Sequence, residues 1–444
     1  MYNIPHYAQK VLETLEKNGF EAYIVGGCVR DFLMKKNPHD FDITTNALPD
    51  ETKKCFEEYK IITNGEKHGT IAVVIEGETV EITTYRIDGD YADSRHPESV
   101  EFSGNLQEDL GRRDFTMNAM ALDKSGRLVD IFDGVKDIEG KVIRTVGNPS
   151  DRFEEDALRI MRALRFASQL GFEIESETSK QVHEKAQLLK NISAERIRDE
   201  FLKLLCGVNA TEILRSYSDV IEIFIPEIRD MYGFLQHTPF HKYDVWEHTL
   251  YAVENVRCDP ILRMTMLLHD IAKPECFSSD ENGVGHFKGH AAFGAKKSMA
   301  ILDRLRFSSK EKKLITELIE NHRNSYSCDT DIKRMMNRIG ADNLRLLLEV
   351  KKADDMAKGI YSKQDKKQIE FAVKRLDEIL ENGECYRISD MKIKGNDLTE
   401  LGLHGSLVGK HLNMLLELIV NNVIDNDREQ LIMYAKQLKE VEKW

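Results

Sequence analysis

The stretch AYIVGGCVRD at residues 22–31, followed by HDFDI at residues 39–43, decides the fold of the N-terminal region. The apolar run Ala22–Val25 predicts a short strand, which ends in a Gly26-Gly27 turn leading into a helix. Backbone N–H groups at such a turn are free to hold phosphate oxygens, and Arg30 adds positive charge. The sequence therefore predicts a phosphate-binding turn in an α/β domain.

Asp40 and Asp42 are the candidate catalytic carboxylates. They are two residues apart, so on a strand they project from the same face. Two such carboxylates can hold a pair of Mg²⁺ ions about 3.5–4 Å apart, which supports in-line phosphoryl displacement. Glu81 is the candidate for a third oxygen ligand. Each feature alone is more often an ordinary turn or a solvated strand edge, but their order and spacing together are specific.

The sequence around these motifs predicts a mixed α/β region. Ile71–Ile75 and Thr79–Tyr85 are strand candidates joined by a hairpin-like connection, and Met117–Leu122 with Leu128–Phe132 suggests a second hairpin. After the break at residues 147–150, amphipathic helices run to the C-terminus. The predicted fold class is α+β, with a small sheet in the head and an all-α remainder.

Composition limits the class of protein. The 444 residues carry 63 Lys and Arg against 76 Asp and Glu, a net charge of −13. No stretch approaches the roughly 18 apolar residues of a membrane span, and the N-terminus lacks a signal-peptide pattern. Seven scattered cysteines without a CxxC pair indicate reduced thiols. We therefore expect a cytoplasmic protein with no membrane contact. Its acidity argues against a broad electrostatic hold on nucleic acid.

Four motifs together resemble those of bacterial class II tRNA nucleotidyltransferases, which are the CCA-adding enzymes and their A-adding and CC-adding relatives of the polymerase β-type superfamily. The motifs are GGCVRD (26–31), HDFDI (39–43), RRDFTMNAMA (112–121) and RFEEDALRIMRALRF (152–166). The resemblance implies Mg²⁺-dependent transfer from CTP and ATP to the 3′ end of tRNA. It also implies a polymerase β-type head at 1–145, a helical neck at 146–235, an HD-type helical domain at 236–360 and a tRNA-binding tail at 361–444.

The resemblance also assigns roles within the motifs. It implies that Arg113 and Asp114 lie near the ribose and phosphates of the incoming nucleotide, with Asn118 one helical turn further on. Gly26, Gly27 and Arg30 would orient the triphosphate.

Asp156 and Arg159 match the family's EDxxR motif and would read the base. On a helix these two residues share a face, where an acceptor beside a donor can pair with the Watson–Crick edge of cytosine or adenine. Arg162 and Arg165 would contact triphosphate or the RNA end. The alternative is a surface ion pair worth about 0.2–0.5 kcal/mol.

The polar stretch at 87–97 matches the loop that enzymes adding the terminal A retain. It disfavours a CC-only enzyme and leaves an A-adding enzyme as the close alternative. A poly(A) polymerase is disfavoured because those relatives typically carry a strongly basic extension that this acidic chain lacks. A pure RNA-binding protein would incorporate no nucleotide.

A second set of candidate metal ligands follows the order H…HD…H…H…D, which resembles the HD-domain phosphohydrolases. Imidazole and carboxylate ligands suit Mn, Fe, Ni, Co or Zn. Single histidines are more often ordinary core or polar positions, and Asp355 is an alternative to Asp354. Both a phosphohydrolase acting on RNA ends and a module that only supports RNA binding remain open. The set is His248, His269, Asp270, His290, His322 and Asp354.

Residues 331–375 carry 12 basic and seven acidic side chains. This excess predicts either a solvated face or a strip that contacts the tRNA backbone. The sequence does not indicate the oligomeric state.

Overall fold

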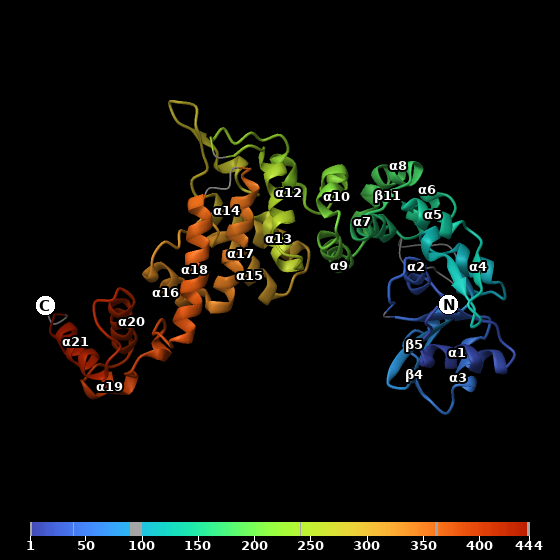
Figure 1. The fold of residues 1–444 in the computed structure, drawn as a ribbon, viewed down its shortest axis with the longest axis horizontal. Helices are drawn as coiled ribbons and strands as arrows, with labels where there is room; N and C mark the ends of the chain where they lie inside the picture. The colour runs from blue at the N-terminus through green and yellow to red at the C-terminus, as the bar shows by residue number, and fades with distance from the viewer. Residues whose placement is uncertain (1, 39, 89–99, 240, 360–362, 442–444) are drawn as a thin grey trace. The chain divides into compact units, whose positions relative to one another are not determined.

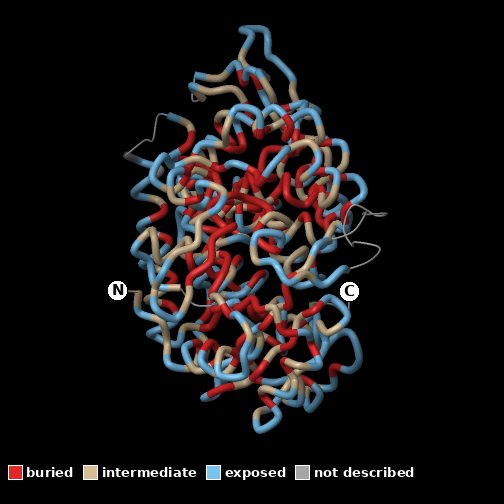
Figure 2. Tube along the Cα trace, turned by 90° about the vertical axis from the view of Figure 1, so that its right-hand side faces the viewer, coloured by how far each residue is buried: buried red, intermediate tan, exposed pale blue. Residues whose placement is uncertain are grey.

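The computed structural model describes residues 2–441 except 39, 89–99, 240 and 360–362 (Figure 1). The chain divides into two compact units, Met1–Pro226 and Glu227–Trp444. Figure 2 shows buried segments toward the inside of the trace and exposed residues on the outer turns and loops. The α+β fold class is confirmed, whereas the finer division into four domains stays a prediction.

The first unit contains a seven-stranded mixed sheet in the order β3-β4-β5-β2-β1-β8-β9. Strands β2 and β5 are parallel, and the other neighbours are antiparallel. Both hairpins predicted from the sequence are confirmed, as β4–β5 and β8–β9. The strands are β1 (Ala22–Val25), β2 (Asp42–Thr45), β3 (Lys60–Ile62), β4 (Thr70–Ile75), β5 (Glu78–Thr84), β8 (Met120–Leu122) and β9 (Leu128–Asp130).

The core of the head lies between this sheet and its helices. Ile71, Val73 and Ile75 alternate inward along β4, as expected for a strand with one buried face. They join the apolar face of α1 (His6–Lys17) in one cluster. This packing fixes the position of β1, which leads into the Gly-Gly turn, and of β2 and β5, which carry Asp42 and Glu81.

Helices and short strands complete the first unit. The helices are α2 (Gly27–Leu33), α3 (Pro49–Cys55), α4 (Leu106–Gly111), α5 (Gly134–Gly140), α6 (Pro149–Glu155), α7 (Leu158–Leu170), α8 (Ser176–Glu184), α9 (Ala194–Leu205), α10 (Ala210–Ser216) and α11 (Ser218–Ile221). Two further strand pairs are β6 (Arg86–Asp88) with β7 (Val100–Phe102) and β10 (Val142–Ile143) with β11 (Glu173–Ile174).

The second unit is almost entirely helical, as predicted. Helices α12, α13, α15 and α17 pack against one another, and α19, α20 and α21 surround a separate apolar core. The helices are α12 (Val245–Asn255), α13 (Pro260–Leu268), α14 (His290–Arg304), α15 (Ser309–Asn321), α16 (Asp329–Ile339), α17 (Ala341–Ala357), α18 (Lys363–Glu381), α19 (Gly395–Glu400), α20 (Ser406–Val420) and α21 (Arg428–Val441). The strands β12 (Ser278–Ser279) and β13 (Gly285–His286) form a small hairpin.

Short 3-10 helices connect several of these elements: η1 (Glu66–His68), η2 (Thr116–Asn118), η3 (Ala186–Asn191), η4 (Pro226–Met231), η5 (Pro274–Cys276) and η6 (Ile388–Asp390). Among the described helices, none combines the length and the hydropathy needed to cross a bilayer.

Candidate active site and metal cluster

The Gly-Gly turn joins β1 to α2 and lies against the predicted site residues. Gly26 has φ 79° and ψ −137°, a backbone conformation that L side chains rarely adopt. A Cβ at Gly26 would lie 3.1 Å from Nη1 of Arg113 and 4.0 Å from Oδ2 of Asp42. The backbone conformation therefore favours glycine here, and a Cβ would also press against the Arg113 guanidinium.

The sheet register places Glu81 beside Asp42, because β2 and β5 run parallel with these two residues as partners. Asp40 precedes β2 instead of lying on it, but the exposed–buried–exposed pattern of Asp40, Phe41 and Asp42 keeps both carboxylates on the solvent side. Surrounding protein raises the pKa of Asp42, and repulsion from Glu81 raises it further, while Arg113 opposes both. Three acidic groups and one arginine therefore share one exposed face of the central strands β2 and β5.

Asp109 is a site residue that the sequence analysis missed. Its side chain is fully buried on α4 and accepts hydrogen bonds from Arg112, Arg113 and Thr44. Burial alone would raise the pKa of Asp109, but Arg112 and Arg113 outweigh it and lower the pKa. The available signal was its spacing, since an acidic residue three and four positions before two arginines can pair with both on a helix.

A chain of hydrogen bonds links four predicted nucleotide-site residues. Nη1 of Arg30 donates to Asn118 at 3.0 Å, and Nδ2 of Asn118 donates to Asp114 at 3.1 Å. The guanidinium of Arg162 donates to the same Asp114 carboxylate at 2.7 and 2.5 Å. Burial opposes the charge on Asp114, but mainly Arg162 lowers its pKa to about 2. The network holds α2, η2 and α7 together around the Gly-Gly turn.

The predicted helical face shared by Asp156 and Arg159 is wrong. Asp156 ends α6 with φ −137° and ψ 101°, and α7 begins only at Leu158. The cause is a side-chain cap, because the Asp156 carboxylate accepts the backbone N–H of Leu158 at 3.0 Å. Arg196 also lies 3.2 Å from this carboxylate.

Arg159 is 7% exposed, and its position is fixed by several acceptors. Its guanidinium donates to Glu155 at 2.6 Å and to the backbone carbonyls of Arg152 and Arg112. Arg165, one turn beyond Arg162, pairs with Glu200 at 2.9 Å. The loop predicted at residues 87–97 lies outside the described residues beyond residue 88.

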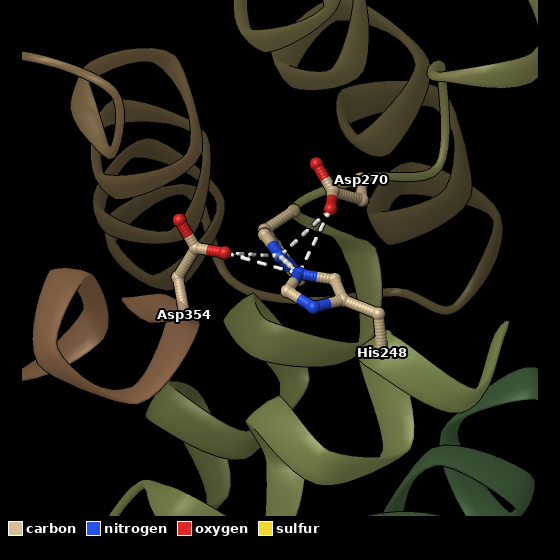
Figure 3. A group of neighbouring side chains, drawn as sticks. His248, Asp270 and Asp354 are labelled. Atoms are coloured by element: carbon tan, nitrogen blue, oxygen red, sulfur yellow. Dashed lines mark hydrogen bonds and ion pairs between the residues drawn. The ribbon is translucent and has the colours of Figure 1, made fainter. Parts of the chain in front are cut away.

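In the second unit, the predicted HD residues converge in a buried cluster. His248 comes from α12, Asp270 from the turn after α13 and Asp354 from α17, and the three point toward one another (Figure 3). Nε2 of His248 lies 3.2 Å from Asp270 and 3.0 Å from Asp354. Nε2 of His269 lies 3.1 Å from Asp270 and 3.6 Å from Asp354. All four residues are at most 3% exposed.

A second group shares Asp270 with the first. Ligand atoms of Asp270, His290 and His322 lie within 4.8 Å of one another, and so do those of His248, His269, Asp270 and Asp354. The structure therefore brings together all six predicted residues. Asp355 points elsewhere and pairs with Lys351 and Lys358, so Asp354 is the carboxylate that faces the cluster.

The imidazoles of the cluster have fixed orientations. Nδ1–H of His269, His290 and His322 each donates to the backbone carbonyl three residues earlier, at 2.6–2.7 Å. This turns each Nε2 toward Asp270, which is the arrangement of metal-binding histidines. Oδ1 of Asp270 and Nε2 of His290 and His322 are buried without a hydrogen-bond partner. These donor atoms fit a transition-metal ion.

The charges of the cluster agree with this fit. Burial opposes ionisation of Asp270 and Asp354, but neighbouring cationic groups outweigh it, and the pKa of each lies well below its usual value. Burial, followed by the charge on His269, lowers the pKa of His322 to about 3. Burial opposes the charge on His269, but Asp270 and Asp354 outweigh it and raise its pKa to about 9. Two ionised carboxylates and a neutral His322 are the protonation states that metal ligation needs, and a bound metal would displace the proton of His269.

The sequence analysis missed the polar residues beside the cluster. Nζ of Lys273 lies 2.6 Å from Asp270 and donates to the buried Gln236 at 2.7 Å. The His241 ring contacts the His248 ring with centroids 5.4 Å apart. A cavity of about 440 Å³ opens here, lined by His241, Lys273, Lys288, His290 and Arg323 among others. The HDxxK spacing of His269, Asp270 and Lys273 was the available signal.

Basic residues in 331–375 are largely engaged in ion pairs. Lys333 is 5% exposed and pairs with Asp329 and Glu384, and Arg375 pairs with the same two carboxylates. Part of the positive excess therefore stabilises the protein itself, and the tRNA strip stays a prediction.

Three family models match the chain in order. They are the "Poly A polymerase head domain" at residues 22–144, the "Probable RNA and SrmB-binding site of polymerase A" at 171–231 and the tRNA nucleotidyltransferase domain 2 at 290–435. The first covers the Gly-Gly turn, Asp42, Glu81 and the Arg113 network.

Two known proteins are similar in sequence to about half of the chain. The CCA-adding enzyme of Lactobacillus helveticus is 46% identical over 246 residues, 54% of this chain and 61% of that protein. The CCA-adding enzyme of Enterococcus faecalis is 50% identical over 202 residues, 46% of this chain and 49% of that protein. The chain thus spans about half to three-fifths of the curated relatives it matches.

One solved structure is similar over nearly the whole chain. The Bacillus stearothermophilus CCA-adding enzyme, in complex with CTP, has a TM-score of 0.73 and 27% identity over 98% of both chains. The Thermotoga maritima CCA-adding enzyme complexed with tRNA, at 20% identity and a TM-score of 0.57, shares the fold over 96% of this chain and 93% of that one.

The head matches the family model of the poly(A) polymerase head domain, and its fold and site agree with that class. The other matched models, the relatives and the solved structure make the chain similar to the class II tRNA nucleotidyltransferases, the family of the CCA-adding enzymes.

Proposed function

We propose that the protein adds or repairs the 3′-terminal CCA of tRNA, using CTP and ATP without a nucleic-acid template. The observation that carries this proposal is the pairing of Asp42 with Glu81 beside the Gly26 turn and Arg113. Carboxylates on one face of a sheet, next to a phosphate-binding turn, can bind the metal ions that phosphoryl transfer requires. The relatives named above supply the substrate class.

Asp40, Asp42 and Glu81 would hold Mg²⁺, which when bound stabilises charge on the α-phosphate and promotes ionisation of the attacking hydroxyl. The raised pKa of Asp42, due to its surroundings and to Glu81, fits a carboxylate group that awaits a cation. The Gly26-Gly27 turn and Arg113 would orient the triphosphate. The tRNA 3′-oxygen then bonds to the α-phosphorus, the bond to the β-phosphate bridging oxygen breaks, and pyrophosphate leaves.

Base selection would rest on Asp156 and Arg159. Cytosine and adenine both present an exocyclic amino donor and a ring-nitrogen acceptor, so a carboxylate acceptor and a guanidinium donor can pair with either. The acceptors around Arg159 and the pairing of Asp156 with Arg196 hold both groups in place without a template strand. Such preorganisation limits the entropy lost on nucleotide binding.

The test offers tRNAs that end before CCA, after C and after CC, each with labelled CTP, ATP or both. CCA addition predicts extension of all three by the missing residues. Addition of A to the CC end alone would establish the A-adding alternative. No incorporation on any of the three, with Mg²⁺ and folded protein, would exclude nucleotidyl transfer.

We also propose a second, metal-dependent phosphoesterase activity in the helical unit, acting on RNA ends. The converging Nε2 atoms and the cavity with Lys273, Lys288 and Arg323 support it. The six cluster residues would hold Mn, Fe, Ni, Co or Zn, which would activate water against a phosphoester. RNAs with a 3′-phosphate or 2′,3′-cyclic phosphate, incubated with each metal, test it; no hydrolysis with any metal bound would leave the cluster a structural site.

The proposed partner is tRNA, held by the helices that follow the head, and the proposed location is the cytoplasm.

A further inference from the structure

Phe166 closes the motif that begins at Arg152, and nothing in the proposed chemistry uses it. Its ring, on α7, is 6% exposed and is surrounded by three guanidinium groups. The central carbons of Arg165, Arg30 and Arg162 lie 4.0, 5.2 and 5.4 Å from its centroid. Significant cation–π contacts occur about once per 70–80 residues, so three on one ring is a concentrated feature.

The three arginines come from separate parts of the site. Arg30 lies on α2, and a Cβ at Gly27 would lie 3.5 Å from its Nη2, which places it against the phosphate-binding turn. Arg162 belongs to the Asp114 network, and Arg165 pairs with Glu200. The Phe166 ring is the one group among the described residues with a cation–π contact to all three.

Like charges so close together repel, and a ring partly offsets this cost. Burial, with a further contribution from Arg162 and Arg30, lowers the pKa of Arg165 to about 10. The negative face of an aromatic ring attracts each cation, whereas an aliphatic side chain of similar volume would not. The ring is itself fixed by an edge-to-face contact with the buried Phe115, at 5.8 Å and 85°.

Each guanidinium also has a carboxylate partner at one end: Asp31 for Arg30, Asp114 for Arg162 and Glu200 for Arg165. The ion pairs hold the guanidinium nitrogens, and the ring attracts the charged groups from the other side of the contact. Together they fix the position of three cations next to the turn where the triphosphate would bind.

We propose that Phe166 is a positioning residue for the triphosphate, acting through the orientation of Arg30, Arg162 and Arg165. This inference rests on the proposed nucleotidyl transfer. Because the arginines would contact phosphates and not the base, Phe166 affects CTP and ATP to the same extent.

The experiment compares F166L, F166Y and the control F172L in the full-length protein. Phe172 is 4% exposed, follows α7, and has no cation stacked on it among the described residues. We measure KM and kcat for CTP and ATP, calorimetric binding of inorganic tripolyphosphate, and the unfolding midpoint. F166L should raise both KM values about tenfold and weaken tripolyphosphate binding by the same factor, with F166Y near wild type and F172L altering stability only.

Three results would overturn the proposal: unchanged KM and tripolyphosphate affinity in F166L, a change in KM for only one nucleotide, or an equal KM change in F172L at the same loss of stability. The proposed activity fails separately. If the wild type incorporates no nucleotide but F166L still loses tripolyphosphate affinity, the positioning role stands while nucleotidyl transfer falls. Normal incorporation with an indifferent F166L rejects the positioning role alone.

Discussion

The two acidic sites of this chain differ in how they meet solvent. At the head, Asp40, Asp42 and Glu81 lie on an exposed face of the sheet beside Arg113. In the helical unit, the cluster of His248, His269, Asp270 and Asp354 is buried. Hydrogen bonds to backbone carbonyls fix the rings of His269, His290 and His322. Open carboxylates suit a Mg²⁺ ion that arrives with substrate phosphates, whereas a buried set with fixed tautomers suits a resident metal.

Inactivating one site alone tests most directly whether the two sites are independent. Asp42→Ala should lower CCA incorporation at least about a thousandfold, because loss of a metal-holding carboxylate removes transition-state stabilisation. Metal content and phosphoesterase activity of the helical unit should not change. Radiolabel incorporation and metal analysis measure the two effects. Asp50→Ala, an exposed carboxylate on α3, is the control, and equal loss in both variants would reject the assignment of Asp42.

The reciprocal experiment uses two adjacent residues on α17. Asp354→Asn should lower the affinity of the helical cluster for metal about a hundredfold, because its Oδ1 lies within 3.0–3.6 Å of two ligand histidines. Asp355→Asn is the matched control, since that carboxylate pairs with Lys351 and Lys358 instead of the ligand histidines. Lys358 also lies 3.8 Å from Asp354. Metal bound per chain, measured after dialysis, separates them. Incorporation should persist in both, and metal retention by Asp354→Asn would contradict the ligand set.

The sequence predicted the head well because its signals are local. Two hairpins and a Gly-Gly turn are set by residues close together in the chain, and the register of β2 with β5 then brings Glu81 to Asp42. Asp156 shows what local sequence signals do not predict. Its side chain caps the next helix and interrupts the helix on which Asp156 and Arg159 were expected to share a face. Asp109 and Gln236 were missed because their importance depends on burial, which arises only when distant segments pack.

The buried carboxylate of Asp109 should contribute both to the stability of the head and to nucleotide binding. Asp109→Asn should destabilise the head by about 2–3 kcal/mol, because Arg112 and Arg113 lose a charged partner in a desolvated position. It should also raise KM for both nucleotides, since Arg113 lies beside the Gly26 turn. Urea unfolding and steady-state kinetics measure these effects. A variant as stable as wild type would show that Asp109 contributes no net pairing energy.

The weakest of these effects should be a pH dependence of the unfolding free energy that is due to Asp114. Its pKa is about 2 in the folded protein, mainly because the Arg162 pair outweighs burial, against an ordinary value of 3.8. A depressed pKa means that the folded state favours the ionised form. The stabilisation, about 2 kcal/mol for a shift of this size, is therefore fully present above about pH 4 and is lost as the pH falls toward 2.

The carboxylates of the helical cluster also have depressed pKa values, so acid destabilisation of the wild type alone does not isolate Asp114. The measurement is the difference in unfolding free energy between wild type and Asp114→Asn at pH 5 and at pH 3, from urea titrations followed by a probe in the head. The difference should shrink at the lower pH, because protonation begins to remove from the wild type the charge that the variant lacks. A difference that is constant, or that grows as the pH falls, would mean that the Arg162 pair does not hold the ionised carboxylate, and the head would lose the feature that ties α7 to the nucleotide site.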